Sequence, residues 1–244
     1  MKKNESLLVK FISFAFFVIM LIINYTYQAE VSAISQVNKP LIQPSGYTFS
    51  IWVLIYLGLF CMFIYSFLKK EPSIYEHEAI KYLLPLNFTF NSLWVLSYTS
   101  EQFLVSCFII VGVLLTTANI YLIFKQQPTL PKFIPAVFSI YLGWISVATI
   151  VNIFSFVNRL NPVPWTMDQQ LILTILVLII VVLFAIYMLV RYNDKLIPLT
   201  IVWSLVGIAM RQTSPFLTLF CYSASALLIL LVLVFWARGR RKQV

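Results

Sequence analysis

The chain has 244 residues, of which 61% are hydrophobic and only 10% are charged, and its mean hydropathy is +0.92. A soluble domain of this size needs more polar surface than that to cover its core, so the composition excludes a soluble globular protein. It predicts an all-α integral membrane protein that crosses the bilayer several times. The net charge of +9 comes from short basic stretches between apolar runs, a pattern typical of membrane topology signals and not of nucleic-acid binding.

The first predicted helix is the apolar run from Leu7 to about Tyr27, which follows Lys2 and Lys3. The run is longer than the hydrophobic part of a typical signal peptide, and the stretch 31–33 is only a weak cleavage-like site. We therefore expect this helix to be retained. A loop of mixed polarity should follow it and end in the turn-forming stretch Lys39–Gly46, which contains two prolines and a glycine.

Seven further helices are predicted between loops that contain charged residues, proline or glycine. Their approximate limits are Tyr47–Leu68, Lys81–Tyr98, Phe103–Phe124, Phe133–Val157, Gln169–Val190, Leu196–Met210 and Thr213–Trp236. The run Leu196–Met210, with about 15 residues, is short for a span that needs about 20. Short connections predict that helices adjacent in the chain are antiparallel neighbours.

The basic residues predict how the helices cross the membrane. All 17 Lys and Arg residues except Lys39, Arg159 and Arg211 fall at the termini or at one set of alternating loops. By the positive-inside rule both termini are then cytoplasmic, which requires an even number of spans and favours eight. We expect a multi-pass protein of a cell membrane, such as a bacterial inner or plasma membrane.

The predicted helix interiors contain few groups that could perform acid–base or metal chemistry. We expect no Asp, Glu, Lys or Arg inside them, which argues against a proton relay or a charged ion-coupled carrier. The only histidine, His77, lies in a loop between two glutamates and is read as a solvated residue. Cys61, Cys107 and Cys221 lie in apolar runs without metal-ligand spacing. We therefore expect neither an enzyme nor a bound metal.

Aromatic side chains recur beside amides or hydroxyls at helical spacing on three predicted helices. The three faces are Thr48, Trp52 and Tyr56; Asn87, Asn91 and Trp94; and Tyr141, Trp144, Ala148 and Asn152. Turned toward one another, they would form an aromatic-walled cavity with a few hydrogen-bonding groups, suited to a flat apolar ligand. The same residues allow a second interpretation, in which the polar groups bond one another across helices and only stabilise the packing.

Three stretches of the sequence resemble the signature motifs of a known family. They are Pro44–Tyr56, with Trp52 and Tyr56 as W-x-x-x-Y; Asn91–Trp94, as N-x-x-W; and Tyr141–Asn152, as Y-L-x-W-x-x-x-A-x-x-x-N. In this order and on these helices they are similar to the tryptophan-rich sensory protein family (TspO/MBR), which includes the translocator protein, or peripheral benzodiazepine receptor. The resemblance covers residues 1–157.

The resemblance implies a five-helix transmembrane bundle with a pocket for porphyrins, sterol-like molecules or synthetic aromatic ligands. The loop Lys39–Tyr47 would cap this pocket. Residues 158–244 would then add three transmembrane helices and a basic cytoplasmic tail. The implied function is that of an integral membrane sensor or translocator that binds a flat hydrophobic ligand, such as a porphyrin, a haem-like molecule or a sterol-like molecule. The ligand-binding residues would be Trp52, Tyr56, Asn87, Asn91, Trp94, Tyr141, Trp144, Ala148 and Asn152.

A different class of function remains open from the sequence. All eight helices could form a transporter or channel for a small uncharged or hydrophobic solute, although the expected lack of intramembrane charge and of an internal repeat argues against it. The expected partners are the lipid bilayer and the hydrophobic ligand. Ser139 and Gly143 form a small-xxx-small pair that is compatible with a homodimer.

Overall fold

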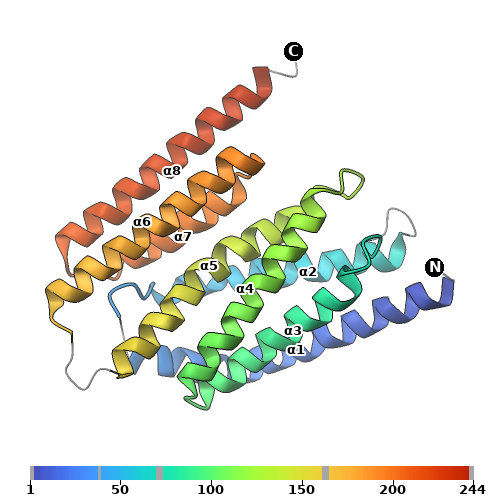
Figure 1. Cartoon of the computed structure of the whole chain (residues 1–244), viewed down its shortest axis with the longest axis horizontal. Helices are drawn as coiled ribbons and strands as arrows, with labels where there is room; N and C mark the ends of the chain where they lie inside the picture. Colours follow the sequence, from blue (N-terminus) through green and yellow to red (C-terminus); the bar gives the residue numbers. More distant parts are fainter. Residues whose placement is uncertain (1–2, 38–39, 70–73, 161–164, 242–244) are drawn as a thin grey trace. The chain divides into compact units, whose positions relative to one another are not determined.

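A computed structural model describes residues 3–37, 40–69, 74–160 and 165–241 of the chain (Figure 1). Within these ranges the chain forms eight α-helices and one short 3₁₀ helix, η1, and no strand. The elements are α1 Lys3–Val37, η1 Gly46–Ser50, α2 Ile51–Leu68, α3 Ile80–Thr99, α4 Phe103–Lys125, α5 Phe133–Leu160, α6 Met167–Tyr192, α7 Leu196–Ala209 and α8 Pro215–Arg241. The all-α prediction is confirmed.

Six helices of the described chain are long and apolar enough to cross a membrane: α1, α2 with η1, α4, α5, α6 and α8. Of the other two, α7 has only 14 residues, and α3 includes Lys81, Pro85, Asn87 and Asn91 among its 20 residues. The eight helices predicted from the sequence are present. That all eight cross the bilayer, with both termini on the cytoplasmic side, stays a prediction from the charge pattern.

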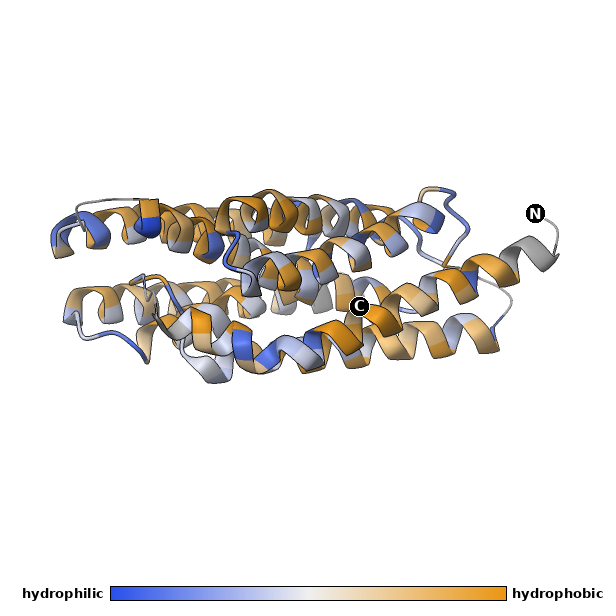
Figure 2. Cartoon of the chain, turned by 90° about the horizontal axis from the view of Figure 1, so that it is seen from below, coloured by the Kyte–Doolittle hydropathy of each residue, from blue (hydrophilic) through white to orange (hydrophobic). Residues whose placement is uncertain are grey.

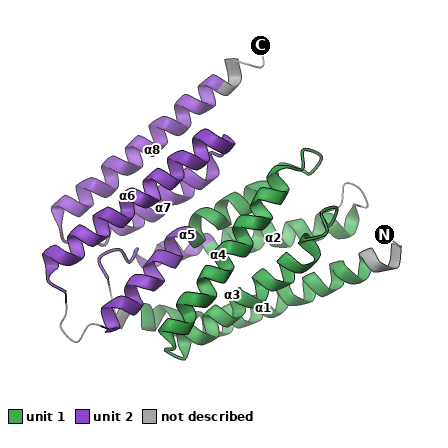
Figure 3. Ribbon diagram, in the orientation of Figure 1, with its two compact units in different colours: residues 1–37, 52–145 green, residues 38–51, 146–244 purple. Residues whose placement is uncertain are grey.

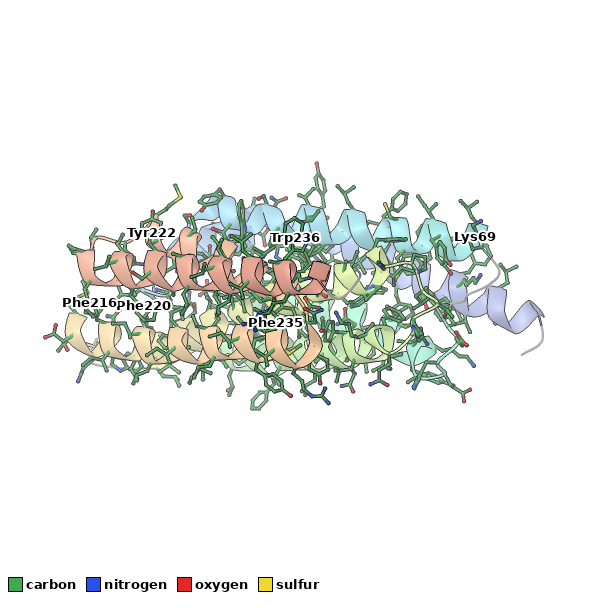
Figure 4. All side chains as sticks on the ribbon, turned by 90° about the horizontal axis from the view of Figure 1, so that it is seen from above. Lys69, Phe216, Phe220, Tyr222, Phe235 and Trp236 are labelled. Carbon is green, nitrogen blue, oxygen red and sulfur yellow. The ribbon has the colours of Figure 1, made fainter. Side chains whose placement is uncertain are left out.

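Apolar residues cover most of the helix surfaces, and the most hydrophilic residues lie mainly toward helix ends and in loops (Figure 2). On α8, Figure 4 shows Phe216, Phe220 and Tyr222 toward one end and Phe235 and Trp236 toward the other. At 1.5 Å per residue, about 30 Å of helix separates Phe216 from Trp236, which matches the thickness of the hydrocarbon core. Aromatic residues at both ends of an apolar helix are typical of the two membrane interfaces.

The first helix differs from its prediction in length and in charge. It continues for ten residues past Tyr27, to Val37, so the predicted loop of mixed polarity begins too early. The segment lacks glycine and proline, and it contains the helix formers Ala29 and Glu30, which explains why its polarity does not end the helix. The expectation of charge-free helix interiors is also wrong here, because Lys10 lies in α1 with only 8% of its surface exposed and donates to the carbonyl of Ser66.

The chain divides into two compact units (Figure 3). Unit 1 comprises residues 1–37 and 52–145, which include α1–α4 and the first part of α5. In it α3 packs against both α1 and α4. Its core contains a group of phenylalanines from α1, α2 and α3 whose contacting rings have centroids 5.2 to 6.3 Å apart, formed by Phe14, Phe17, Phe63 and Phe88.

Small residues let α2 and α5 approach closely inside unit 1. A methyl group placed on Gly58 of α2 would overlap one methyl of Val137 on α5 and would lie 3.1 Å from the other. On α5, Ser139 and Gly143 are both buried. The small surface that they provide therefore lies within the fold of the chain, and the homodimer suggested by their spacing stays a prediction.

Unit 2 comprises residues 38–51 and 146–244, which include η1, the second part of α5 and α6–α8. Its α6 begins with a capping box, in which Thr166 and Gln169 satisfy each other's backbone N–H groups. The turn from α6 to α7 is tight because Asn193 adopts a left-handed conformation, with φ of 50°. The buried carboxylate of Asp194 then accepts from the backbone N–H groups of Leu196 and Ile197, and so begins α7.

Candidate functional site

Trp52 and Tyr56 lie one turn apart on α2, the spacing that the W-x-x-x-Y motif predicts for one helix face. Their rings are stacked, with centroids 5.3 Å apart and planes inclined by 21°. Both side chains are half-buried. The stacked pair therefore presents two nearly parallel aromatic planes in unit 1.

The first part of α5 brings two more aromatic rings to Trp52. Tyr141 lies 5.6 Å from it at an interplanar angle of 72°, and Trp144 lies 6.2 Å from it at 84°, both measured between ring centroids. These are edge-to-face contacts, in which the positive ring edge meets the negative ring face. Tyr141 and Trp144 are each only 1% exposed. Trp52 thus contacts three other predicted site residues, and the four form one aromatic cluster: Trp52, Tyr56, Tyr141 and Trp144.

A chain of hydrogen bonds joins this cluster to two other helices through the amide of Asn24 on α1. The Tyr56 hydroxyl donates to Asn24 Oδ1 at 2.8 Å, and Asn24 Nδ2 donates to Asn91 Oδ1 on α3 at 2.8 Å. Asn91 Nδ2 then donates to the Tyr141 hydroxyl at 3.1 Å. Four helices, α1, α2, α3 and α5, are therefore connected by one polar path. We call these six residues, Asn24, Trp52, Tyr56, Asn91, Tyr141 and Trp144, the aromatic–amide cluster.

Asn24 is the member of this cluster that the motifs did not indicate. It lies inside the apolar run of the first helix, where an amide turned to hydrocarbon would lose its hydrogen bonds. That signal alone predicts that its side chain faces protein. It does not predict which side chains Asn24 meets, because those belong to helices distant in the sequence.

Asn87, on α3, makes hydrogen bonds to residues of α4. Its Nδ2 donates to Thr116 Oγ1 at 2.8 Å and to Thr117 Oγ1 at 2.9 Å, both on α4, and it lies 3.3 Å from the Val113 carbonyl. Its side chain is fully buried. These contacts make Asn87 a polar tether between α3 and α4, and its participation in ligand binding stays a prediction.

Trp94 packs against Tyr98 on its own helix, with ring centroids 5.6 Å apart, and Tyr98 in turn contacts Phe103 at the start of α4. These contacts place Trp94 in a second aromatic group. Ala148 and Asn152 belong to the second part of α5, in unit 2, where Ala148 is half-buried and Asn152 is 3% exposed. That they line the same pocket as Trp52 stays a prediction.

The loop that was expected to cap a pocket is bonded to α7. The backbone N–H of Ser45 donates to the Gly207 carbonyl at 2.9 Å, and the indole N–H of Trp203 donates to the Thr48 carbonyl at 2.9 Å. A methyl group on Gly207 would overlap the Thr48 side chain, so the close approach requires glycine at this position. Lys39, the first residue of the loop that was predicted to cap the pocket, lies outside the described residues.

The residues that follow α7 extend this attachment along the loop. Arg211 Nη1 donates to the Gln43 carbonyl at 3.0 Å, and Gln212 Nε2 donates to the Leu41 carbonyl at 2.6 Å. Burial lowers the pKa of the Arg211 guanidinium, because it disfavours the charged form. These bonds attach the loop and η1 to α7 and its C-terminal turn within unit 2. The motifs gave no indication of this role for α7.

Metal ligands do not gather anywhere in the described parts of the chain, where no group of three or more His, Cys, Asp or Glu residues could hold an ion. His77 lies in the loop before α3, and its Nδ1 accepts from the backbone N–H of Ala79 at 3.3 Å.

These features define a class: a multi-pass α-helical membrane protein with an aromatic–amide cluster inside its first unit. A family model described as TSPO-like protein matches residues 10–235, and the chain belongs to that family. The matched region extends well past residue 157 and includes α6, α7 and most of α8, so these helices lie within the region of family similarity. No curated protein and no solved structure gave a significant match to the chain.

Proposed function

We propose that this TspO-type membrane protein binds a flat hydrophobic ligand, a tetrapyrrole or a sterol-like molecule, at the aromatic–amide cluster, and that it acts by binding without catalysis. The observation that carries the proposal is the convergence of Trp52, Tyr56, Tyr141 and Trp144 from two helices, with the amides of Asn24 and Asn91 beside them. Aromatic faces provide a large apolar contact area, and a few fixed polar groups orient the ligand.

The exposure of the cluster supports a role beyond packing. Tyr141 and Trp144 are buried, whereas Trp52 and Tyr56 are only half-buried, so part of each of these two side chains is not covered by the chain. A planar ligand can stack on such a surface without first breaking the buried contacts. The competing interpretation, in which the hydrogen-bond chain serves only to hold four helices together, predicts no ligand affinity at this place.

Titration of the full-length protein in detergent with the dimethyl ester of protoporphyrin IX distinguishes the two interpretations. Binding is followed by the absorbance of the porphyrin, because variants that lack a tryptophan also lose fluorescence. We expect Trp52→Ala and Trp144→Ala to weaken binding at least about fivefold, since one aromatic contact contributes about 1 kcal/mol beyond the area it buries. The matched control is Trp236→Ala, which removes a half-exposed tryptophan from α8.

Circular dichroism must first confirm that each variant retains its helices. An affinity that stays within twofold of the parent in both cluster variants would contradict the proposal and leave the packing interpretation. A loss in the Trp236→Ala control equal to that in the cluster variants would contradict it as well, because the loss would then not be specific to the cluster.

A further inference from the structure

We infer that the aromatic–amide cluster selects an uncharged ligand that donates a hydrogen bond to the Tyr56 hydroxyl oxygen, an inference that rests on the proposed function. It follows from the direction of the hydrogen bonds in the cluster and from the positions of the charged residues of unit 1. A sterol-like alcohol or a neutral tetrapyrrole with N–H groups fits this description. A tetrapyrrole that carries ionised carboxylates at the cluster does not.

The direction of the hydrogen-bond chain is set at its centre by a backbone group. Asn24 Nδ2 lies 2.9 Å from the Met20 carbonyl, which can only accept a hydrogen bond. The amide nitrogen of Asn24 must therefore be on that side, and its oxygen faces the Tyr56 hydroxyl. Because an amide oxygen can only accept, the Tyr56 proton is the one used in that bond.

The rest of the chain follows from the same orientation. Asn24 Nδ2 also donates to Asn91, so the atom of Asn91 that it meets must be the oxygen, and Asn91 Nδ2 faces the Tyr141 hydroxyl. Asn91 and Tyr141 are each 1% exposed and form the buried end of the chain. The other end is the half-buried residue Tyr56. Its hydroxyl proton is used in the bond to Asn24, and its oxygen retains lone pairs that can accept a further hydrogen bond. A ligand group that bonds there must supply the hydrogen.

No member of the cluster carries a charge at neutral pH, since it consists of amides, indoles and phenols. The basic residues on the same helices lie far along them. At 1.5 Å per residue, Lys10 is about 20 Å from Asn24 on α1, and Lys69, at the end of α2 in Figure 4, is about 20 Å from Tyr56. Lys81 is about 15 Å along α3 from Asn91. Lys132 precedes α5, and Arg159, in the last turn of α5, is about 27 Å along that helix from Tyr141. A carboxylate buried in the cluster would lose its hydration without gaining a cation from these helices, which is costly.

Two matched ligand pairs test the inference in detergent with the full-length protein. Protoporphyrin IX and its dimethyl ester differ in charge at the carboxyl groups, and cholestanol and cholestan-3-one differ in a hydroxyl donor at one ring position. The steroids are measured by competition with the ester. Because the uncharged ligands also partition into micelles, the affinity assigned to the site is the part that Trp52→Ala abolishes.

We expect the dimethyl ester to bind at least about tenfold more tightly than the free acid at neutral pH, because burial of an ionised group is unfavourable. We expect the alcohol to bind about two- to tenfold more tightly than the ketone, the range of one net hydrogen bond. The Tyr56→Phe variant should lose the preference for the alcohol and keep the preference for the ester. Tyr222→Phe, which changes an exposed tyrosine on α8, is the control and should keep both preferences.

The outcomes separate this inference from the proposed function. Equal or tighter Trp52-dependent binding of the free acid would overturn the inference and leave the function in place. Persistence of the preference for the alcohol in Tyr56→Phe would overturn the assignment of Tyr56 as the acceptor. Absence of Trp52-dependent binding for every probe would overturn the proposed function and the inference together.

Discussion

Removing the amide of Asn24 should destabilise unit 1 more than the loss of any single surface hydrogen bond. In Asn24→Ala, the Tyr56 hydroxyl and the Asn91 carbonyl oxygen each lose a partner at 2.8 Å, so two interhelical bonds disappear at once. The bond to Met20 lies within α1 and joins no helices. The change therefore removes a side chain that hydrogen-bonds α1 to both α2 and α3.

The magnitude follows from these two bonds. Interhelical hydrogen bonds in membrane proteins contribute about 0.6 kcal/mol each on average, which sets a lower value of about 1 kcal/mol. If the Tyr56 hydroxyl and the Asn91 oxygen find no new partner, the penalty for each buried unsatisfied group is about 1–3 kcal/mol. We therefore expect the free energy of unfolding to fall by about 1–6 kcal/mol.

The assay is reversible unfolding by sodium dodecyl sulfate in mixed micelles, followed by circular dichroism. The matched control is Asn119→Ala on α4, because Asn119 is exposed and its amide bonds only the Leu115 carbonyl of its own helix, at 2.8 Å. The control should change the free energy of unfolding by less than about 0.5 kcal/mol. A loss in Asn24→Ala that equals the loss in Asn119→Ala would refute the reasoning. The double variant Asn24→Ala/Tyr56→Phe should lose less free energy of unfolding than the sum of the two single losses, because both substitutions remove the same hydrogen bond between Tyr56 and Asn24.

Two glycines give further predictions about close helix contacts. Gly58→Ala should lower the free energy of unfolding by about 1–3 kcal/mol, because the new methyl overlaps Val137, and Val137→Ala should restore part of that loss. Gly207→Ala should loosen the loop that precedes α2, seen as faster proteolysis between α1 and α2, and Thr48→Ala should slow that cleavage again. Gly46→Ala meets no atom within 4 Å and is the control in both assays. If it has the same effect as the other two, steric overlap is not the cause.

Local sequence patterns predicted most of the helices and one face of the site. Apolar runs bounded by proline, glycine or charge set the limits of most helices to within a few residues, and spacing of four residues placed Trp52 and Tyr56 on one face of α2. The polarity pattern places the end of α1 too early, because mixed polarity is typical of loops, although the residues after Tyr27 are compatible with a helix. These properties depend on neighbours within one or two turns, which a single sequence contains.

The tertiary structure decided which helices each polar side chain joins. By spacing alone Asn87 and Asn91 share one face of α3, yet Asn87 bonds α4 while Asn91 bonds α1 and α5. The contacts of Asn24 with α2 and α3, and the attachment of the α1–α2 loop to Gly207 on α7, join residues far apart in the sequence. The apolar and polar pattern of a helix states which side must be covered. It does not state by which partner, because that depends on the packing of all the helices together.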